Sequence, residues 1–131
     1  MYLVDTNIFI EGLLEQKKTK DVQGFFQSVS LEKVFMTDLS LHSIGIILFR
    51  LKKFDLFMMF INDMIIDGVG ILSLSHQDMK ELSLVSQQYS LDFDDAYQYV
   101  VAEKHGLQLI SFDKDFDILP AKRKEPSEVL R

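Results

Sequence analysis

The stretch DDAYQYVVAEKHGLQLISFD, residues 94–113, contains the pattern that decides the fold. Residues 94–105 predict a helix that ends at Gly106, and residues 107–111 form a short apolar run that predicts a strand. Such a helix is about 18 Å long at about 1.5 Å per residue. The strand together with the residue after it, 107–112, returns about 20 Å at about 3.3 Å per residue. Because the two lengths nearly cancel, we expect Asp95 and Asp113 at the same edge of a sheet.

Short apolar runs alternate with stretches of helical periodicity along the rest of the chain. This alternation predicts βαβ units and an α/β fold with helices on both faces of the sheet, in one domain over residues 1–131. Its mostly parallel sheet should have four to five strands, which end at a common edge where such sheets bind ligands. Strands are predicted at residues 2–4, 34–37, 69–74 and 107–111, and helices at about 8–14, 20–28, 40–51, 55–66, 75–88 and 94–105.

Composition narrows the class of protein. Of the 131 residues, 47% are hydrophobic and 26% are charged, which is typical of a globular domain. The chain has no cysteine, which excludes disulfides and thiolate metal ligands and fits a cytoplasmic location. The net charge of −6 argues against nucleic-acid binding driven by charge alone. It does not exclude a nuclease, because a bound metal ion offsets acidic charge at the site itself.

No targeting or membrane-spanning segment is expected. The first residues meet Asp5 too early for a signal peptide and carry no basic region before it. The most apolar stretch, residues 44–66, is interrupted by several charged side chains, whereas a spanning helix needs about 20 mostly uncharged residues. The aromatic and methionine-rich part of this stretch, Phe54–Ile66, is expected in the core or, where a face stays exposed, at a homodimer or partner interface.

Three aspartates are the main candidates for chemistry. Asp5 ends the first predicted strand and should therefore reach the edge that Asp95 and Asp113 share. Several carboxylates at one edge repel one another unless a cation binds. Their hard oxygen atoms suit Mg²⁺ or Mn²⁺, either of which can activate water against a phosphodiester. Asp115 and Asp117 follow closely and are further candidates.

Each aspartate also has a purely structural interpretation. Asp5 can cap the helix that begins near Asn7. Asp95 can sit at the third position of a helix, where the dipole favours an acid, and Asp113 can form a local turn. Taken singly, the structural interpretation is favoured for each residue. Together, the three point to a metal site.

Three motifs resemble those of PIN-domain proteins, whose best-known small members are VapC-type toxins. They cover nearly the whole chain in the expected order: Val4-Asp5-Thr6-Asn7, then Asp95-Ala96 followed by Ala102-Glu-Lys-His-Gly106, then Leu109-Ile-Ser-Phe-Asp113-Lys-Asp-Phe116. The resemblance implies a PIN-like, Rossmann-like three-layer α/β/α sandwich. It also implies a Mg²⁺- or Mn²⁺-dependent endoribonuclease with Asp5, Asp95 and Asp113 as its catalytic and metal-binding residues. Thr6 and Asn7, and Asp94 beside Asp95, are the auxiliary residues. It also implies an RNA substrate, an antitoxin protein as partner, and a homodimer.

One position departs from the family pattern. The family normally has a glutamate early in the helix after the second strand, and the matching position here is Ser43. Serine cannot supply the missing charge, although Asp38 is near enough in sequence to be a candidate substitute. His42, beside Ser43, is expected to be structural.

Two other functions compete with the nuclease. The Ser43 departure and the acidic balance favour a PIN-like domain that binds RNA or protein without turnover. An aspartyl phosphotransferase also uses an aspartate after a first strand. Such enzymes commonly have a second aspartate two residues later, where this chain has Asn7, so this alternative ranks last.

Overall fold

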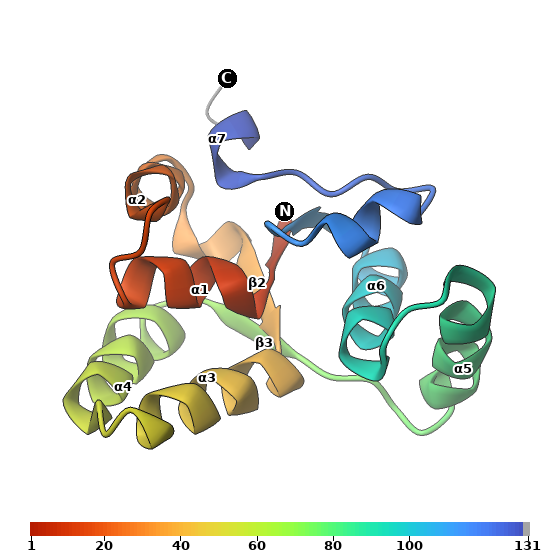
Figure 1. Ribbon diagram of the computed structural model, residues 1–131, viewed down its shortest axis with the longest axis horizontal. Coiled ribbons are helices and arrows are strands. Elements are labelled where there is room, and N and C mark those ends of the chain that lie inside the picture. The colour runs from red at the N-terminus through yellow and green to blue at the C-terminus, as the bar shows by residue number, and fades with distance from the viewer. Residues whose placement is uncertain (130–131) are drawn as a thin grey trace.

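The computed structural model describes residues 1–129, which form a four-stranded parallel sheet between two layers of helices (Figure 1). The strands lie in the order β3-β2-β1-β4, with every neighbouring pair parallel. This confirms the predicted α/β sandwich and the number of strands. A further parallel bridge joins Ile110 to Lys124 beyond β4. The strands are β1 (Tyr2–Val4), β2 (Val34–Thr37), β3 (Gly70–Leu72) and β4 (Gln108–Ile110).

The alternation of side chains along the strands divides the core between the two faces of the sheet. Leu3 and Leu109 face the cluster formed with α5 and α6, whereas Val4 and Ile110 face the cluster formed with α1 to α4. Figure 1 shows α1 to α4 on one side and α5 and α6 on the other. The helices are α1 (Thr6–Leu13), α2 (Thr19–Ser28), α3 (Asp38–Arg50), α4 (Phe54–Phe60), α5 (Asp78–Tyr89), α6 (Phe93–His105) and α7 (Pro126–Val129).

The helices next to the strand ends begin at polar caps. Asp5 caps α1 through its side chain, as one of the two interpretations of this residue predicts. Thr37 caps α3, which begins at Asp38, two residues before the start of the helix expected at about 40–51. Gly106 ends α6 in the left-handed conformation, with φ of 62°. These caps fix where each helix starts and stops relative to the strand ends.

The middle of the chain departs from the predicted elements. The helix expected at 55–66 is α4 followed by a wider π-helical turn, Ile61–Ile66, and the strand expected at 69–74 is the shorter β3. Within the described part of the chain, β3 is an edge strand that pairs only with β2, and after it the N–H of Leu74 donates to the hydroxyl of Tyr97 (2.8 Å). The strand ends at Leu72 because its partner Thr37 is the last residue of β2, and α3 begins at the next residue. Across residues 1–129, no helix combines the length and apolar character needed to cross a membrane.

Candidate metal centre

The buried polar side chains of residues 1–129 gather where the parallel strands end. Four of them line one cleft, and the fifth donates a hydrogen bond into it. Burying a polar group costs free energy unless it is hydrogen-bonded. A cluster of buried polar side chains at one place therefore suggests a functional site. The five residues are Asp5, Thr37, Ser40, Gln98 and Ser111.

Asp5 lies at the centre of this group and is only 6% exposed. Its Oδ1 accepts from the Thr6 backbone N–H (2.7 Å) and from Nε2 of Gln98 (2.6 Å). Its Oδ2 accepts from the hydroxyl of Ser111 (2.6 Å) and from Nδ2 of Asn7 (3.1 Å). Four donors fill roughly the whole acceptor capacity of one carboxylate.

Burial raises the pKa of the Asp5 carboxyl above its ordinary value. The hydrogen bonds from Ser111, Gln98 and Thr6 oppose this shift because they favour the charged form, and the nearby charge of Asp113 adds to it. The donors therefore offset part of the effect of burial, which alone would favour the neutral acid still more strongly.

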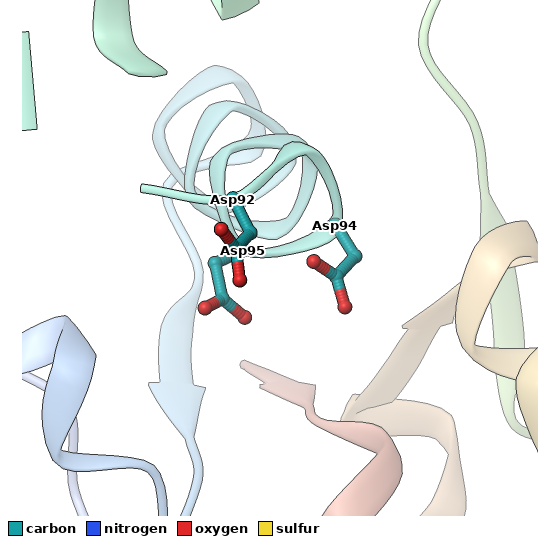
Figure 2. A group of neighbouring side chains, drawn as sticks. All are labelled: Asp92, Asp94 and Asp95. Atoms are coloured by element: carbon teal, nitrogen blue, oxygen red, sulfur yellow. The ribbon is translucent and has the colours of Figure 1, made fainter. Parts of the chain in front are cut away.

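Asp95 is the third residue of α6, and its carboxyl also has a raised pKa. Burial, followed by the charges of Asp94 and Asp113, raises the pKa of Asp95 to about 7. Figure 2 shows Asp92, Asp94 and Asp95 together at the first turn of α6, with their carboxylates on the side toward the strand ends. A carboxylate that resists ionisation beside other carboxylates is a group that lacks a counter-charge.

Asp113 completes the set that the sequence predicts. It follows β4, and its Oδ1 accepts from the Asp115 backbone N–H (2.9 Å), so the structural turn is present as well. Asp95, Asp113 and Asp115 each offer an oxygen within 4.8 Å of the other two. Asp5 is not part of that tight group but lines the same cleft as Asp95 and Asp113.

The cleft has a volume of about 360 Å³ and is acidic. No lysine or arginine occurs among the described residues that line it. Of the sequence candidates, Thr6, Asn7, Ser43 and Asp94 line this cleft. Its full lining is Asp5, Thr6, Asn7, Ile10, Thr37, Leu39, Ser40, Ser43, Ile47, Asp94, Asp95, Gln98 and Asp113.

Three candidate acids lie elsewhere. Oδ1 of Asp38 accepts from the Leu39 N–H and from the hydroxyl of Tyr97, both at 2.9 Å, and Asp38 is not in the cleft lining. Asp117 forms an ion pair with Arg123 (2.9 Å). Asp115 lines a neighbouring depression that it shares with Asp95. Only Asp115 of these three therefore approaches the carboxylates of the cleft.

Sequence reasoning missed Gln98 and Ser111, which both donate to Asp5. Spacing could have revealed them. Gln98 lies three residues after Asp95, on the same side of a helix. Ser111 lies two residues before Asp113, on the same side of an extended segment.

The side chains present fit a hard divalent cation. The donors available around the cleft are carboxylate, hydroxyl and amide oxygens, which Mg²⁺ and Mn²⁺ prefer. A positive ion would also remove the repulsion that raises the pKa of Asp95. The chemistry of the donors and the electrostatics of the cleft therefore agree.

The sequence profile of the PIN domain matches residues 2–122, and the chain belongs to the PIN domain family. No curated protein matches the sequence.

Solved structures share this fold at low sequence identity. VapC20 from Mycobacterium tuberculosis, described as a sarcin-ricin loop cleaving toxin, is 16% identical with a TM-score of 0.81 over 96% of this chain and 100% of that one. A toxin-antitoxin complex from Klebsiella pneumoniae is 21% identical with a TM-score of 0.76, over 96% and 98%. FitAcB from Neisseria gonorrhoeae is 18% identical with a TM-score of 0.75, over 96% and 98%. At these identities, the likeness shows the fold.

Proposed function

We propose that this chain is a Mg²⁺- or Mn²⁺-dependent endoribonuclease that cleaves single-stranded or structured RNA, as the toxin of a toxin–antitoxin pair in the cytoplasm. The observation that carries the proposal is the acidic cleft, in which Asp5, Asp95 and Asp113 meet and the pKa of Asp95 is raised to about 7. Membership of the PIN domain family supports the reaction class. The likeness to VapC20 and to toxin–antitoxin complexes supports the biological role.

The residues of the cleft have separate tasks in this proposal. Asp95 and Asp113, with Asp115 beside them, would hold the ion through carboxylate oxygens. When bound, the ion lowers the pKa of water and offsets charge on the phosphodiester. Asp5 would offer the ion a further carboxylate oxygen from the same cleft, and its bond with Gln98 ties the strand end to α6. Thr6 and Asn7 line the cleft and can donate hydrogen bonds to phosphate oxygens.

A second surface supports the proposed protein partner. Large apolar side chains of α3 and α4 are exposed, and exposed apolar patches usually mark interaction sites. We propose that this surface, the α3–α4 patch, takes part in a homodimer or in binding an antitoxin. Its members are Ile46, Phe49, Phe54, Met58 and Met59.

Metal-dependent turnover tests the enzyme. Wild-type protein is incubated with single-stranded RNA and Mn²⁺, Mg²⁺ or EDTA, and cleavage is expected only with metal. Asp95→Asn should lower the rate at least about 100-fold, the usual effect of removing one electrostatic group from a reacting centre. Asp67→Asn removes the same charge at an exposed position outside the cleft lining and should cleave like wild type.

A binding module is the second candidate, and Ser43 is the observation that favours it. Ser43 lines the cleft at the position where the family resemblance expects a glutamate, so one negative charge is missing. In that case the protein would bind RNA or a protein without cleaving it. Wild-type turnover no greater than that of Asp5→Asn, with RNA binding retained, would establish this alternative.

A further inference from the structure

Gln98 is an amide in a part of α6 that is otherwise apolar. It is only 5% exposed, and its Nε2 donates to Oδ1 of Asp5 at 2.6 Å. Its Oε1 is buried and has no hydrogen-bond partner among residues 1–129. The other buried residues of this helix are Ala96, Tyr97, Val100, Val101 and Ala102.

The orientation of this amide is fixed by charge. Turning it around would bring Oε1 to the position of Nε2, in contact with a carboxylate oxygen of Asp5. The observed orientation leaves one buried acceptor unpaired, which costs stability that an apolar side chain of similar size would not cost. The benefit of this amide is therefore the single N–H that it gives to Asp5.

The four donors around Asp5 are not equivalent. Oδ1 is held by two short bonds, from the Thr6 backbone and from Gln98. Oδ2 is held by a short bond from Ser111 and by a longer one, 3.1 Å, from Asn7. The second N–H of the same Asn7 amide donates to the Ser111 hydroxyl (3.2 Å), so this amide is divided between two acceptors. The Asn7 position on Oδ2 is thus the most weakly held of the four.

We propose that Gln98 is the positioning residue of the ion site: it pins Oδ1 of Asp5 and leaves Oδ2 as the atom at which a cation can replace the donor from Asn7. The inference rests on the proposed function, because it assigns a task within the same cleft. Gln98 itself does not touch the ion or the RNA. It acts through the orientation of the Asp5 carboxylate.

Metal affinity measured without any substrate tests this role. Mn²⁺ binding is measured by calorimetry for wild type, Gln98→Met and Gln108→Met. Gln98→Met keeps the length of the side chain and removes its hydrogen bond, and it should weaken Mn²⁺ binding by about 10- to 100-fold, as loss of a ligand-orienting partner typically does. Gln108→Met is the matched control, because the Gln108 amide donates to backbone carbonyls of Leu109 and Lys122 and not to Asp5. It should bind Mn²⁺ like wild type.

A second measurement uses the wild-type protein alone, in case Gln98→Met does not fold. The side-chain amide protons of Gln98 should exchange slowly with solvent in NMR spectra and stay protected when Mg²⁺ saturates the protein. Loss of that protection on adding Mg²⁺ would overturn the positioning role, as would Gln98→Met with wild-type Mn²⁺ affinity. A wild-type protein that binds no Mn²⁺ would instead remove the proposed function, and the task of Gln98 with it.

Discussion

The two sides of helix α3 carry opposite kinds of surface. Toward the strand ends, Ser40, Ser43 and Ile47 line the acidic cleft. On its other side, Ile46 and Phe49 help to line an apolar groove of about 770 Å³, completed by Leu41, His42, Gly45, Arg50 and Phe57. One helix thus separates a site with excess negative charge from a site with excess exposed apolar area.

Both surfaces are unfavourable in the isolated chain, but for different physical reasons. The cleft is destabilised by repulsion between carboxylates, which depends on pH and on cations. The α3–α4 patch is destabilised by contact of apolar groups with water, which depends on protein concentration when a second copy covers it. A metal ion at the cleft and a protein partner at the α3–α4 patch should therefore stabilise the protein independently of each other.

The largest effect is expected from a charged substitution in the α3–α4 patch, on the apolar side of α3. Met58 is 56% exposed, so Met58→Glu should fold normally as a monomer. If the α3–α4 patch forms a homodimer, the new charge would be buried in the interface. The dissociation constant should then rise at least about 30-fold, or about 2 kcal/mol. Analytical ultracentrifugation over a range of concentrations measures this.

Leu84 provides the control for this prediction. It is 67% exposed on α5, and Leu84→Glu should leave the dimer unchanged. Mn²⁺ affinity should be the same in both variants, because neither residue lines the cleft. A wild-type protein that stays monomeric at high micromolar concentration would contradict the homodimer and leave a different partner for the patch.

On the acidic side of α3, Asp95 should make the metal-free stability of the protein depend on pH. The pKa of Asp95 is raised in the folded state from 3.8 to about 7. Between these values the folded protein binds more protons than the unfolded chain, so the metal-free stability should fall as pH rises through this range. The contribution of Asp95 to the metal-free stability is fully present below about pH 4 and is lost above about pH 7. Urea unfolding at pH 5 and pH 8 in EDTA measures the difference.

Asp95→Asn should remove most of this pH dependence. At pH 8 the variant should be more stable than wild type by about 1–2 kcal/mol, allowing for solvent screening of a partly exposed group. Asp5→Asn should instead be less stable than wild type at pH 8. Its amide would place N–H groups against donors that now bond to the Asp5 carboxylate. Finding Asp95→Asn less stable than wild type at pH 8 would mean that Asp95 is mainly a structural residue of the helix start.

The fold could be predicted because its signals are local. Apolar runs and helical periodicity gave the four strands and the long helices in the right order. Where the prediction failed, a distant residue decided the outcome. The expected 69–74 strand ends at Leu72 because its partner β2 ends at Thr37, where α3 begins, and nothing in the residues around Leu72 signals where that partner ends.

The residues of the candidate site also divide into those that local sequence signals could place and those that depend on distant contacts. Asp5, Asp95 and Asp113 could be placed in one cleft because each lies at a predictable end of an element. The position of Asp38 could not be predicted, because it depends on the hydroxyl of Tyr97, which is 59 positions away. The same holds for the bond between Gln98 and Asp5, which joins residues 93 positions apart.

The smallest effect is expected from Ser43→Glu, which tests whether the cleft lacks one charge. Ser43 already lines the cleft, so a glutamate there would add a hard oxygen ligand beside Asp94 and Asp95. Mn²⁺ binding should tighten by several-fold to about 10-fold, or up to about 1.4 kcal/mol, and RNA cleavage should increase. The metal-free stability should fall, because the variant adds a like charge to the cleft. Ser83→Glu adds the same charge at an exposed position of α5 and should change neither Mn²⁺ binding nor RNA cleavage.

Asp38→Asn should leave Mn²⁺ binding unchanged, because the Asp38 carboxylate is held by Leu39 and Tyr97 outside the cleft lining. If Asp38→Asn weakened binding while Ser43→Glu did nothing, Asp38 would be the residue that supplies the missing charge.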